Sequence, residues 1–220
     1  MTNDAETTEE LAKFPPPPWR LHGQHWGALF RTDRPVDATE ATALGAKTIF
    51  SKRLGVALLH YTSGTLSYDE LIVSVPIRIG LRPYMWIRDI WVSDTQSQAG
   101  GIHIWNLPKQ MAAFDWNEKT VTINDAIGLV ARLRLNSAPT HWPWAFAIVP
   151  IAGSLNGTWQ TATAKWRGRV SLSKPIVEEW SDRFSERLIP GRAIGFSSSR
   201  FLMTIPAAVT AAKRSETNNR

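Results

Sequence analysis

The sequence predicts a mainly β protein whose antiparallel strands close into a barrel. Short runs rich in β-branched and aromatic residues, separated by turn residues, recur through the middle of the chain. Few helical segments accompany them, and the strand–helix alternation typical of a parallel sheet is missing. A closed barrel is favoured because it leaves no exposed edge strand and, when wide, encloses a ligand cavity. The 11 tryptophans suit such a cavity, since each brings a large apolar surface.

The expected strands succeed one another from residue 55 onwards. Runs of strand composition span residues 55–61, 67–79, 84–92, 101–106, 120–123, 128–136, 144–153 and 158–166, and a last strand spans 201–205. Asn156-Gly157, which joins the two strands 144–153 and 158–166, is the dipeptide typical of a tight hairpin turn. This spacing is that of a meander.

Helices are expected in two places. Residues 35–46 combine a plausible cap with good helix formers. Ser173-Lys174-Pro175 opens a second expected helix, whose apolar residues recur at helical spacing up to Leu188, before Pro190-Gly191 ends it.

The chain divides into a single expected domain and two tails. Residues 1–18 begin with a polar, acidic stretch and end in four prolines, which predicts a flexible lead and a stiff polyproline spacer. Residues 19–211 form the barrel domain, since about 200 residues suffice for one core. Residues 212–220 are expected to be a disordered tail.

Composition argues against several classes of function. The chain has no cysteine, so disulfides and thiolate metal sites are ruled out. Its histidines form no metal-binding pair, and we find no phosphate loop or dinucleotide fingerprint, so we expect no metal and no cofactor. The formal charge of +6 comes from scattered basic pairs rather than a contiguous face, which argues against a nucleic-acid partner.

The same features predict where the protein resides. No apolar run approaches the roughly 18 residues that a membrane-spanning helix needs, so no membrane partner is expected. The amino-terminal residues lack the basic-then-apolar order of a secretory signal. We therefore expect a cytoplasmic protein.

Lys109 is the most informative single residue. It ends the apolar, aromatic run Gly101–Pro108, and no other charged residue lies between Asp94 and Asp115. Burial of an amine disfavours its charged form and lowers its pKa, which makes it a nucleophile toward carbonyl carbon near neutral pH. The alternative is a lysine whose stem packs while its ammonium group reaches water.

Glu70 is a candidate for a side chain that faces a cavity. If residues 67–79 form a strand, Glu70, Ile72 and Ser74 lie on one face and the intervening apolar residues lie on the other. Glu70 can then face a cavity, although a glutamate on a strand can equally face solvent.

Together these segments resemble the acetoacetate decarboxylase family. The resemblance rests on the Tyr-x-Glu-Leu-Ile run at residues 68–72, on the lysine segment, and on the 39 positions that separate Glu70 from Lys109. The family's lysine segment is approximately Gly-Arg-Glu-x-Trp-Gly-x-Pro-Lys-Lys, and Gly101, Trp105, Pro108 and Lys109 match it. The resemblance implies a cone-shaped closed antiparallel β-barrel with a Schiff-base lysine in a buried pocket, and an enzyme that forms homo-oligomers.

The chain also departs from the family pattern. Gln110 stands where the family has a second lysine, and Ile102-His103 stands where the family has Arg-Glu. The family's amino-terminal arginine falls within residues 22–25, which hold His25 but no arginine. Arg78, Arg82 or Arg88 is a conceivable replacement for a missing cation.

These observations predict a lyase that forms a Schiff base with a keto acid through Lys109, as a decarboxylase or an aldolase-dehydratase. Glu70 is expected to carry a proton or position the amine, and His103 is a second candidate acid or base. Trp105, Gln110, His25 and Arg88 are expected to contact the small-molecule substrate. The alternative function is a cavity protein or cyclase that binds or folds an apolar metabolite without a covalent bond, for which the tryptophans would form the wall.

Overall fold

The computed structural model describes residues 14–136 and 144–211. The predicted flexible lead up to residue 13 and the predicted tail 212–220 lie outside the described residues. Of the predicted polyproline spacer, Pro15 is held against the fold, because its carbonyl accepts a hydrogen bond from Trp19 Nε1 at 2.8 Å. The domain boundaries remain a prediction.

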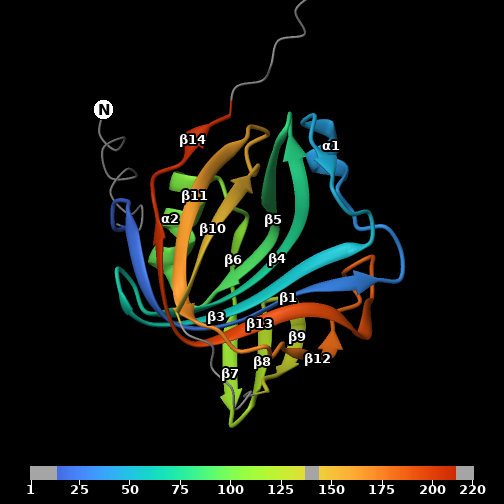
Figure 1. Cartoon of the computed structure of the whole chain (residues 1–220), viewed down its shortest axis with the longest axis vertical. Coiled ribbons are helices and arrows are strands. Elements are labelled where there is room, and N and C mark those ends of the chain that lie inside the picture. The colour runs from blue at the N-terminus through green and yellow to red at the C-terminus, as the bar shows by residue number, and fades with distance from the viewer. Residues whose placement is uncertain (1–13, 137–143, 212–220) are drawn as a thin grey trace, which may run out of the picture.

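Seven long strands close into a barrel (Figure 1). Each strand in the order β4, β3, β1, β13, β11, β10, β5 pairs with the next, and β5 pairs back with β4. Their bounds are β1 Trp19–Thr32, β3 Arg53–Gly64, β4 Tyr68–Ile79, β5 Arg82–Val92, β10 Trp144–Gly153, β11 Gln160–Arg169 and β13 Leu188–Ile205. The predicted closed barrel and the predicted hairpin between β10 and β11 are confirmed.

One pair in the ring is parallel, which corrects the expectation of a purely antiparallel barrel. Strand directions that alternate around a closed ring require an even number of strands, so a ring of seven must contain a parallel pair. That pair is β5 with β10, and it is short, joining Met85 to Ile151 and Trp86 to Ala152. The short strand β6 (Lys109–Met111) adds a second parallel pairing on β5, outside the ring.

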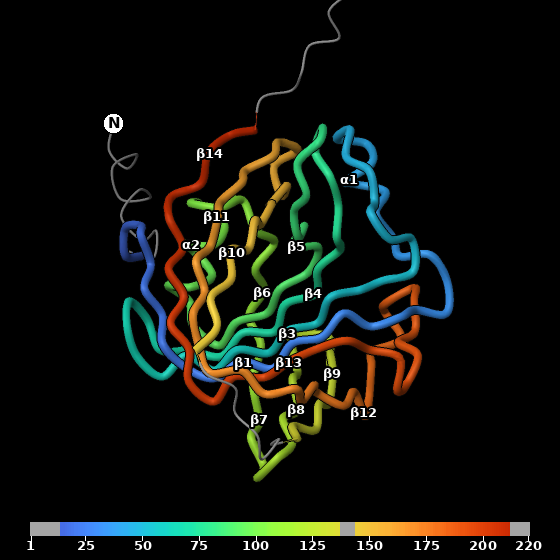
Figure 2. The backbone as a smooth tube through the Cα atoms, viewed as in Figure 1, coloured from blue at the N-terminus to red at the C-terminus, as the bar shows by residue number. Residues whose placement is uncertain are grey.

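A second, four-stranded antiparallel sheet covers part of the outside of the barrel. It consists of β12 (Ile176–Trp180), β9 (Gly128–Arg134), β8 (Thr120–Asp125) and β7 (Ala113–Asn117), in that order. Its apolar side chains, such as Val121, Ile123 and Leu133, form one core with the outward-facing Leu58 and Leu71 of the barrel. The backbone tube shows this sheet lying beneath β1, β3 and β13 (Figure 2).

A separate core fills one end of the barrel interior. Side chains from all around the ring meet in it, and its largest members are aromatic: Trp19, Tyr61, Tyr68, Trp166 and Phe201. Only the interior can bring together residues from opposite sides of a ring. Strand alternation along β4 therefore places Ile72 inside and Leu71 and Val73 outside, as the sequence predicts.

Residues 101–106 form the end of helix α2 (Thr95–Trp105), so the predicted strand there is wrong. The side chain of Asp94 caps this helix by accepting a hydrogen bond from Ser97 N–H at 2.7 Å. Asn106 ends the helix in the left-handed conformation. The apolar composition of 101–106 reflects burial against the barrel rather than a strand.

The predicted helix over residues 173–188 is also wrong. Residues 176–180 form β12, which pairs with β9 through Val177 and Leu133, and the segment then turns into β13. The apolar residues at helical spacing still meet: the rings of Trp180 and Phe184 stack at 4.3 Å. Pairing with the free edge of β9 overrides the local preference for a helix.

The other predicted helix is present in a shorter form. Within residues 35–46 it spans α1 (Thr39–Ala43). Neither described helix has the length and apolar character required to cross a membrane.

An ion pair on the outer face of the barrel is buried. Glu186 is fully buried and accepts a hydrogen bond from Arg88, whose guanidinium also lies 2.7 Å from Asp89. Ser185 Oγ donates to the second oxygen of Glu186 at 2.6 Å. Loss of Glu186 would leave Arg88 with one carboxylate partner, Asp89, instead of two.

We therefore expect Glu186→Ala to lower the free energy of unfolding by about 2 kcal/mol, because it removes the hydrogen bond between two charged groups and leaves Arg88 with Asp89 alone. Glu178→Ala, which breaks the exposed pair with Arg134, should cost less than about 1 kcal/mol. Urea denaturation of both variants measures the difference. Equal losses would show that the Arg88–Glu186 pair is not a stabilising contact.

Candidate functional site

The turn that follows α2 places Lys109 so that its side chain enters the barrel interior. After Asn106 reverses the chain, Lys109 opens β6 and pairs in parallel register with Ile90 of β5. Gln98 of α2 donates a hydrogen bond to the carbonyl of Lys109 at 3.2 Å. Helix and strand together fix the direction of the lysine side chain.

The amine of Lys109 is buried in a polar cluster. Lys109 Nζ donates to Glu70 Oε2 at 2.7 Å and to Ser97 Oγ at 2.9 Å. Lys109 is 6% exposed and Glu70 is 4% exposed. The structure thus brings together the two residues that the sequence selects, and the alternative of a lysine head in water is wrong.

Two tyrosines complete the surroundings of Glu70. Tyr61 Oη donates to Glu70 Oε1 at 3.3 Å and Tyr68 Oη donates to Oε2 at 3.4 Å. Burial, followed by the charge of Glu70, raises the pKa of both phenols well above the ordinary value of 10.0. Both tyrosines therefore stay protonated and act as donors toward the carboxylate.

Gly101 makes room for the lysine stem. A Cβ at position 101 would lie 2.3 Å from Lys109 Cδ and 2.5 Å from Cε. Only glycine therefore lets the lysine lie flat against α2 and reach Ser97. Aromatic rings enclose the amine on other sides, with Nζ 5.3 Å from the ring centroid of Tyr68 and 5.9 Å from that of Trp19.

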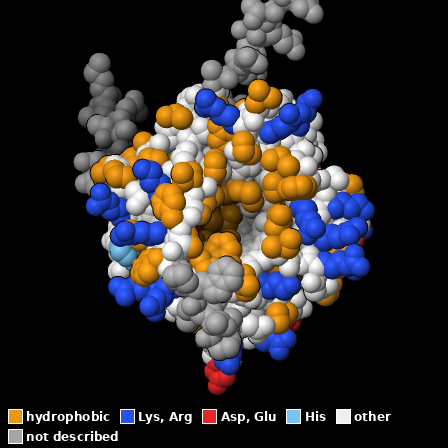
Figure 3. All heavy atoms as spheres, in the orientation of Figure 1, with side chains coloured by type: hydrophobic (Ala, Val, Ile, Leu, Met, Phe, Trp, Pro, Cys, Tyr) orange, Lys and Arg blue, Asp and Glu red, His pale blue; other side chains and the backbone are white. Residues whose placement is uncertain are grey.

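The barrel has a hollow at its centre. The space-filling view shows a depression at the centre of the ring, with hydrophobic side chains around its wall (Figure 3). Several apolar residues that pack against the interior core keep accessible surface, as expected at the wall of a cavity: Ala57, Ile72, Ala147, Ile151, Phe196 and Met203.

His25 also lies on the inner face. It stands opposite Leu59 of β3, which stands opposite Glu70 of β4. Two strand spacings therefore separate His25 and Glu70, or about 10 Å between their backbones. Burial lowers the pKa of His25 from the ordinary 6.5 to about 4, so its ring is neutral at pH 7.

Two of the predicted site residues lie outside the barrel interior. His103 is exposed on α2 and stacks on Phe14 with ring centroids 5.6 Å apart. His103 is exposed because residues 101–105 are helical: two residues beyond Gly101, it lies on a different face of α2. Gln110 is exposed because it follows Lys109 in a strand and points the opposite way.

Arg88 is a third correction. The extra residue of β5 at this point, between the pairs Val73–Asp89 and Ser74–Ile87, turns Arg88 to the outer face. There it contacts Asp89, Glu186 and the ring of Phe184. Arg88 therefore does not contact the interior.

Trp105 forms part of the wall behind the lysine. Its ring packs edge-on against Trp19 at 4.8 Å, and its N–H donates to Pro206 O at 2.8 Å. Its N–H is thus already paired, which leaves a packing role.

The sequence reasoning missed Ser97, Tyr61 and Tyr68. A signal existed for two of them: Tyr68 precedes Glu70 by two positions and so shares its strand face, and Ser97 lies three residues after the cap Asp94. Tyr61 gave no local signal, because only the pairing of β3 with β4 brings it to Glu70.

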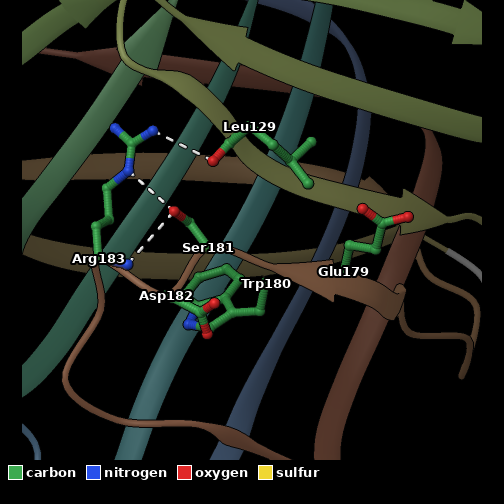
Figure 4. A pocket seen from close by; sticks show the side chains of 6 residues that line it. All are labelled: Leu129, Glu179, Trp180, Ser181, Asp182 and Arg183. Atoms are coloured by element: carbon green, nitrogen blue, oxygen red, sulfur yellow. Dashed lines mark hydrogen bonds between the residues drawn. The ribbon is translucent and has the colours of Figure 1, made fainter.

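Surface grooves near β12 are less suitable as sites. One of about 480 Å³ is bounded by Leu129 and residues 179–183, and Figure 4 shows Arg183 turned to Ser181 and to the carbonyl of Leu129. Arg183 also pairs with Asp125 at 2.5 Å, so its donors already serve the fold. Within the described ranges, no group of three or more His, Asp or Glu side chains could hold a metal ion.

Comparisons with known proteins agree with this geometry. A family model described as acetoacetate decarboxylase matches residues 49–140, a range that includes Glu70, Ser97 and Lys109 but not His25. No curated protein sequence matches the chain.

Several solved structures have a similar fold. Acetoacetate decarboxylase from Legionella pneumophila aligns with a TM-score of 0.64 at 14% identity, covering 91% of this chain and 90% of that one. The enduracididine biosynthesis enzyme MppR complexed with pyruvate aligns at 0.62 and 14% identity, covering 95% and 96%. An acetoacetate decarboxylase-like enzyme from Sphingomonas wittichii RW1 aligns at 0.55 and 16% identity, covering 96% and 99%.

Gly101→Ala should displace the amine, because its Cβ overlaps the lysine stem. We expect the rate at which an aldehyde or keto acid is reductively trapped on Lys109 to change by tenfold or more. Gln96→Ala, at an exposed position of the same helix, is the control and should leave the rate unchanged. Identical rates in both variants would contradict the packing of Lys109 against Gly101.

The low pKa of His25 predicts a pH-dependent loss of stability. As the pH falls, the unfolded chain takes up a proton near pH 6.5, whereas the folded protein resists until about pH 4. Burial of the neutral His25 ring therefore makes its full contribution to the free energy of unfolding above pH 6.5. This contribution decreases by about 2–3 kcal/mol as the pH falls toward 4.

His25→Leu should remove this decline. Urea denaturation at about pH 7 and about pH 4.5 measures it, with His22→Leu, at an exposed position of the same strand, as control. If the free energy of unfolding falls by the same amount in the wild type and in His25→Leu, groups other than His25 cause the pH dependence.

Proposed function

Because this chain is a divergent member of the acetoacetate decarboxylase-like superfamily, we propose that it is a lyase that forms a Schiff base with a keto acid through Lys109. The observation that carries the proposal is the Lys109 amine held 2.7 Å from Glu70 inside the barrel. An amine must lose a proton before it can act as a nucleophile. Away from water, the neighbouring carboxylate of Glu70 is the group that can accept this proton from Lys109.

In the first step, Lys109 passes a proton to Glu70 and its free amine attacks the ketone carbon of the substrate. The carbonyl oxygen then takes a proton from the attacking nitrogen to give a neutral carbinolamine. A proton from Glu70 then helps this hydroxyl leave as water, and the product is a protonated imine, in which carbon is doubly bonded to Nζ. Tyr61 and Tyr68 support the proposal because they donate to Glu70 and so hold its carboxylate in place.

In the second step, the protonated imine accepts an electron pair from an adjacent bond. If that bond joins the α-carbon to a carboxylate, carbon dioxide leaves and an enamine forms. If it joins the α-carbon to a carbinol carbon, an aldehyde leaves and the same enamine forms. Protonation of the enamine carbon and addition of water to the imine release the product and restore the lysine.

The keto-acid class is supported by the neighbouring fold of MppR, which was solved with pyruvate bound. The second reaction type is supported by the MppR structure with the condensation product of pyruvate and imidazole 4-carboxaldehyde. Assembly into homo-oligomers and action on a free small molecule are part of the same proposal.

A non-covalent cavity protein remains the second candidate. The observation that favours it is the apolar wall of the hollow (Figure 3). The two candidates differ in whether substrate becomes attached to Lys109.

Borohydride reduction tests the proposal directly. Protein incubated with pyruvate, acetoacetate or larger keto acids should form an adduct on the peptide that contains Lys109, measured by mass spectrometry after digestion. Lys109→Ala should abolish the adduct, and Lys165→Ala, at an exposed lysine of β11, should leave it unchanged. No adduct with any acid, together with ligand binding that survives Lys109→Ala, would favour the cavity protein.

A further inference from the structure

Two buried nitrogens inside the barrel have no hydrogen-bond partner. They are His25 Nδ1 and the indole Nε1 of Trp166. Trp166 is 6% exposed, and its ring centroid lies 6.2 Å from that of His25. A buried polar group without a partner costs free energy, so a pair of them in one place calls for an explanation.

Aromatic rings surround this pair. Phe196 lies 4.9 Å from the His25 ring and 5.5 Å from the Trp166 ring, and Phe201 lies 6.2 Å from both. Gly27 lets the imidazole lie against β1, because a Cβ there would be 2.7 Å from His25 Nε2. The side chain of Phe196 is only partly buried, which makes it the point of access to the cage.

The cage is next to the proposed reaction site. The ring of Phe201 is 5.8 Å from that of Tyr61, which donates to Glu70. Glu70, Leu59 and His25 are paired across three neighbouring strands, so the backbones of Glu70 and His25 are about 10 Å apart. This separation is within the length of one small molecule.

Neither His25 nor Trp166 carries a charge suited to a carboxylate. His25 is neutral at pH 7, and a tryptophan N–H is uncharged. On the described parts of β1, β3 and β4, the arginines that share the inward alternation are Arg31, Arg53 and Arg78. Arg31 lies six residues along its strand from His25, Arg53 six from Leu59 and Arg78 eight from Glu70, or about 20 Å or more in each case.

We propose that His25 and Trp166 bind the far end of the substrate, and that this end is an uncharged ring or apolar group carrying a hydroxyl or carbonyl oxygen. Such an oxygen accepts a hydrogen bond from Trp166 Nε1, and His25 Nδ1 can donate to it or accept from a hydroxyl. The proposal rests on the proposed function in that the near end of the same molecule is the keto group that Lys109 attacks. It makes an aryl keto acid a better substrate than acetoacetate.

Trapping rates test the substrate class. For the wild-type protein we expect 4-hydroxyphenylpyruvate to be trapped on Lys109 faster than phenylpyruvate, and both faster than pyruvate or acetoacetate. Trp166→Phe keeps a ring and removes only the donor, so it should reduce the preference for the hydroxylated acid by about tenfold. Trp180→Phe is the matched control, because Trp180 also has a buried unpartnered N–H but lies outside the barrel.

A second measurement separates this proposal from the proposed function. Calorimetry with 4-hydroxyacetophenone and the Lys109→Ala protein reports on the cage without a covalent bond. We expect binding that Trp166→Phe weakens about tenfold and that His25→Leu also weakens, with melting curves to verify that each variant is folded.

The outcomes are distinct. Binding to Lys109→Ala that depends on Trp166, with no keto acid trapped on the wild type, would retain the cage and overturn the Schiff-base function. Trapping of pyruvate or acetoacetate that Trp166→Phe leaves unchanged, without a preference for aryl acids, would retain the function and overturn the cage as a substrate site.

Discussion

A lysine and a glutamate face each other inside the barrel with almost no access to water, and much of the surrounding structure serves to hold them there. Glu70 comes from β4, Lys109 from the start of β6, and Ser97 from α2, so three elements meet at one amine. A buried charge pair is tolerated only where each member has hydrogen-bond partners. Tyr61 and Tyr68 supply donors to the carboxylate, and Ser97 supplies an acceptor to the amine.

Helix α2 explains the lysine motif in physical terms. Asp94 caps the helix, Gly101 leaves space for the lysine stem, and Asn106 turns the chain so that Lys109 can pair with β5. The spacing from Gly101 to Lys109 therefore reflects the geometry in which α2 and β6 enclose the lysine side chain. Of the apolar residues between Gly101 and Lys109, Trp105 and Leu107 are buried in the interior core.

The interior has two parts with different chemistry. At the Lys109 end, ionised and phenolic groups form a connected network. At the His25 end, aromatic rings surround neutral nitrogens that have no partner. Strand pairing sets both parts within reach of one small molecule, because Glu70, Leu59 and His25 stand in one row across three strands. Under the two proposals, substrate preference should depend on His25 of β1 and Trp166 of β11, and bond making on Glu70 of β4 and Lys109 of β6.

The sequence by itself determined the barrel, the hairpin at Asn156-Gly157 and the alternation along β4, because strand composition and turn chemistry are local signals. The pairing of Glu70 with Lys109 followed from the resemblance to a family, since no local signal joins two residues 39 positions apart. The sequence did not determine that residues 101–106 are helical, that residues 176–180 are a strand, or that Arg88 points outward. These depend on contacts between distant segments: the packing of α2 on the barrel, the free edge of β9 and the extra residue in β5. Tyr61 and Trp166 could be found only in the tertiary structure, since strand pairing brings them to Glu70 and His25 and nothing near them in the chain records it.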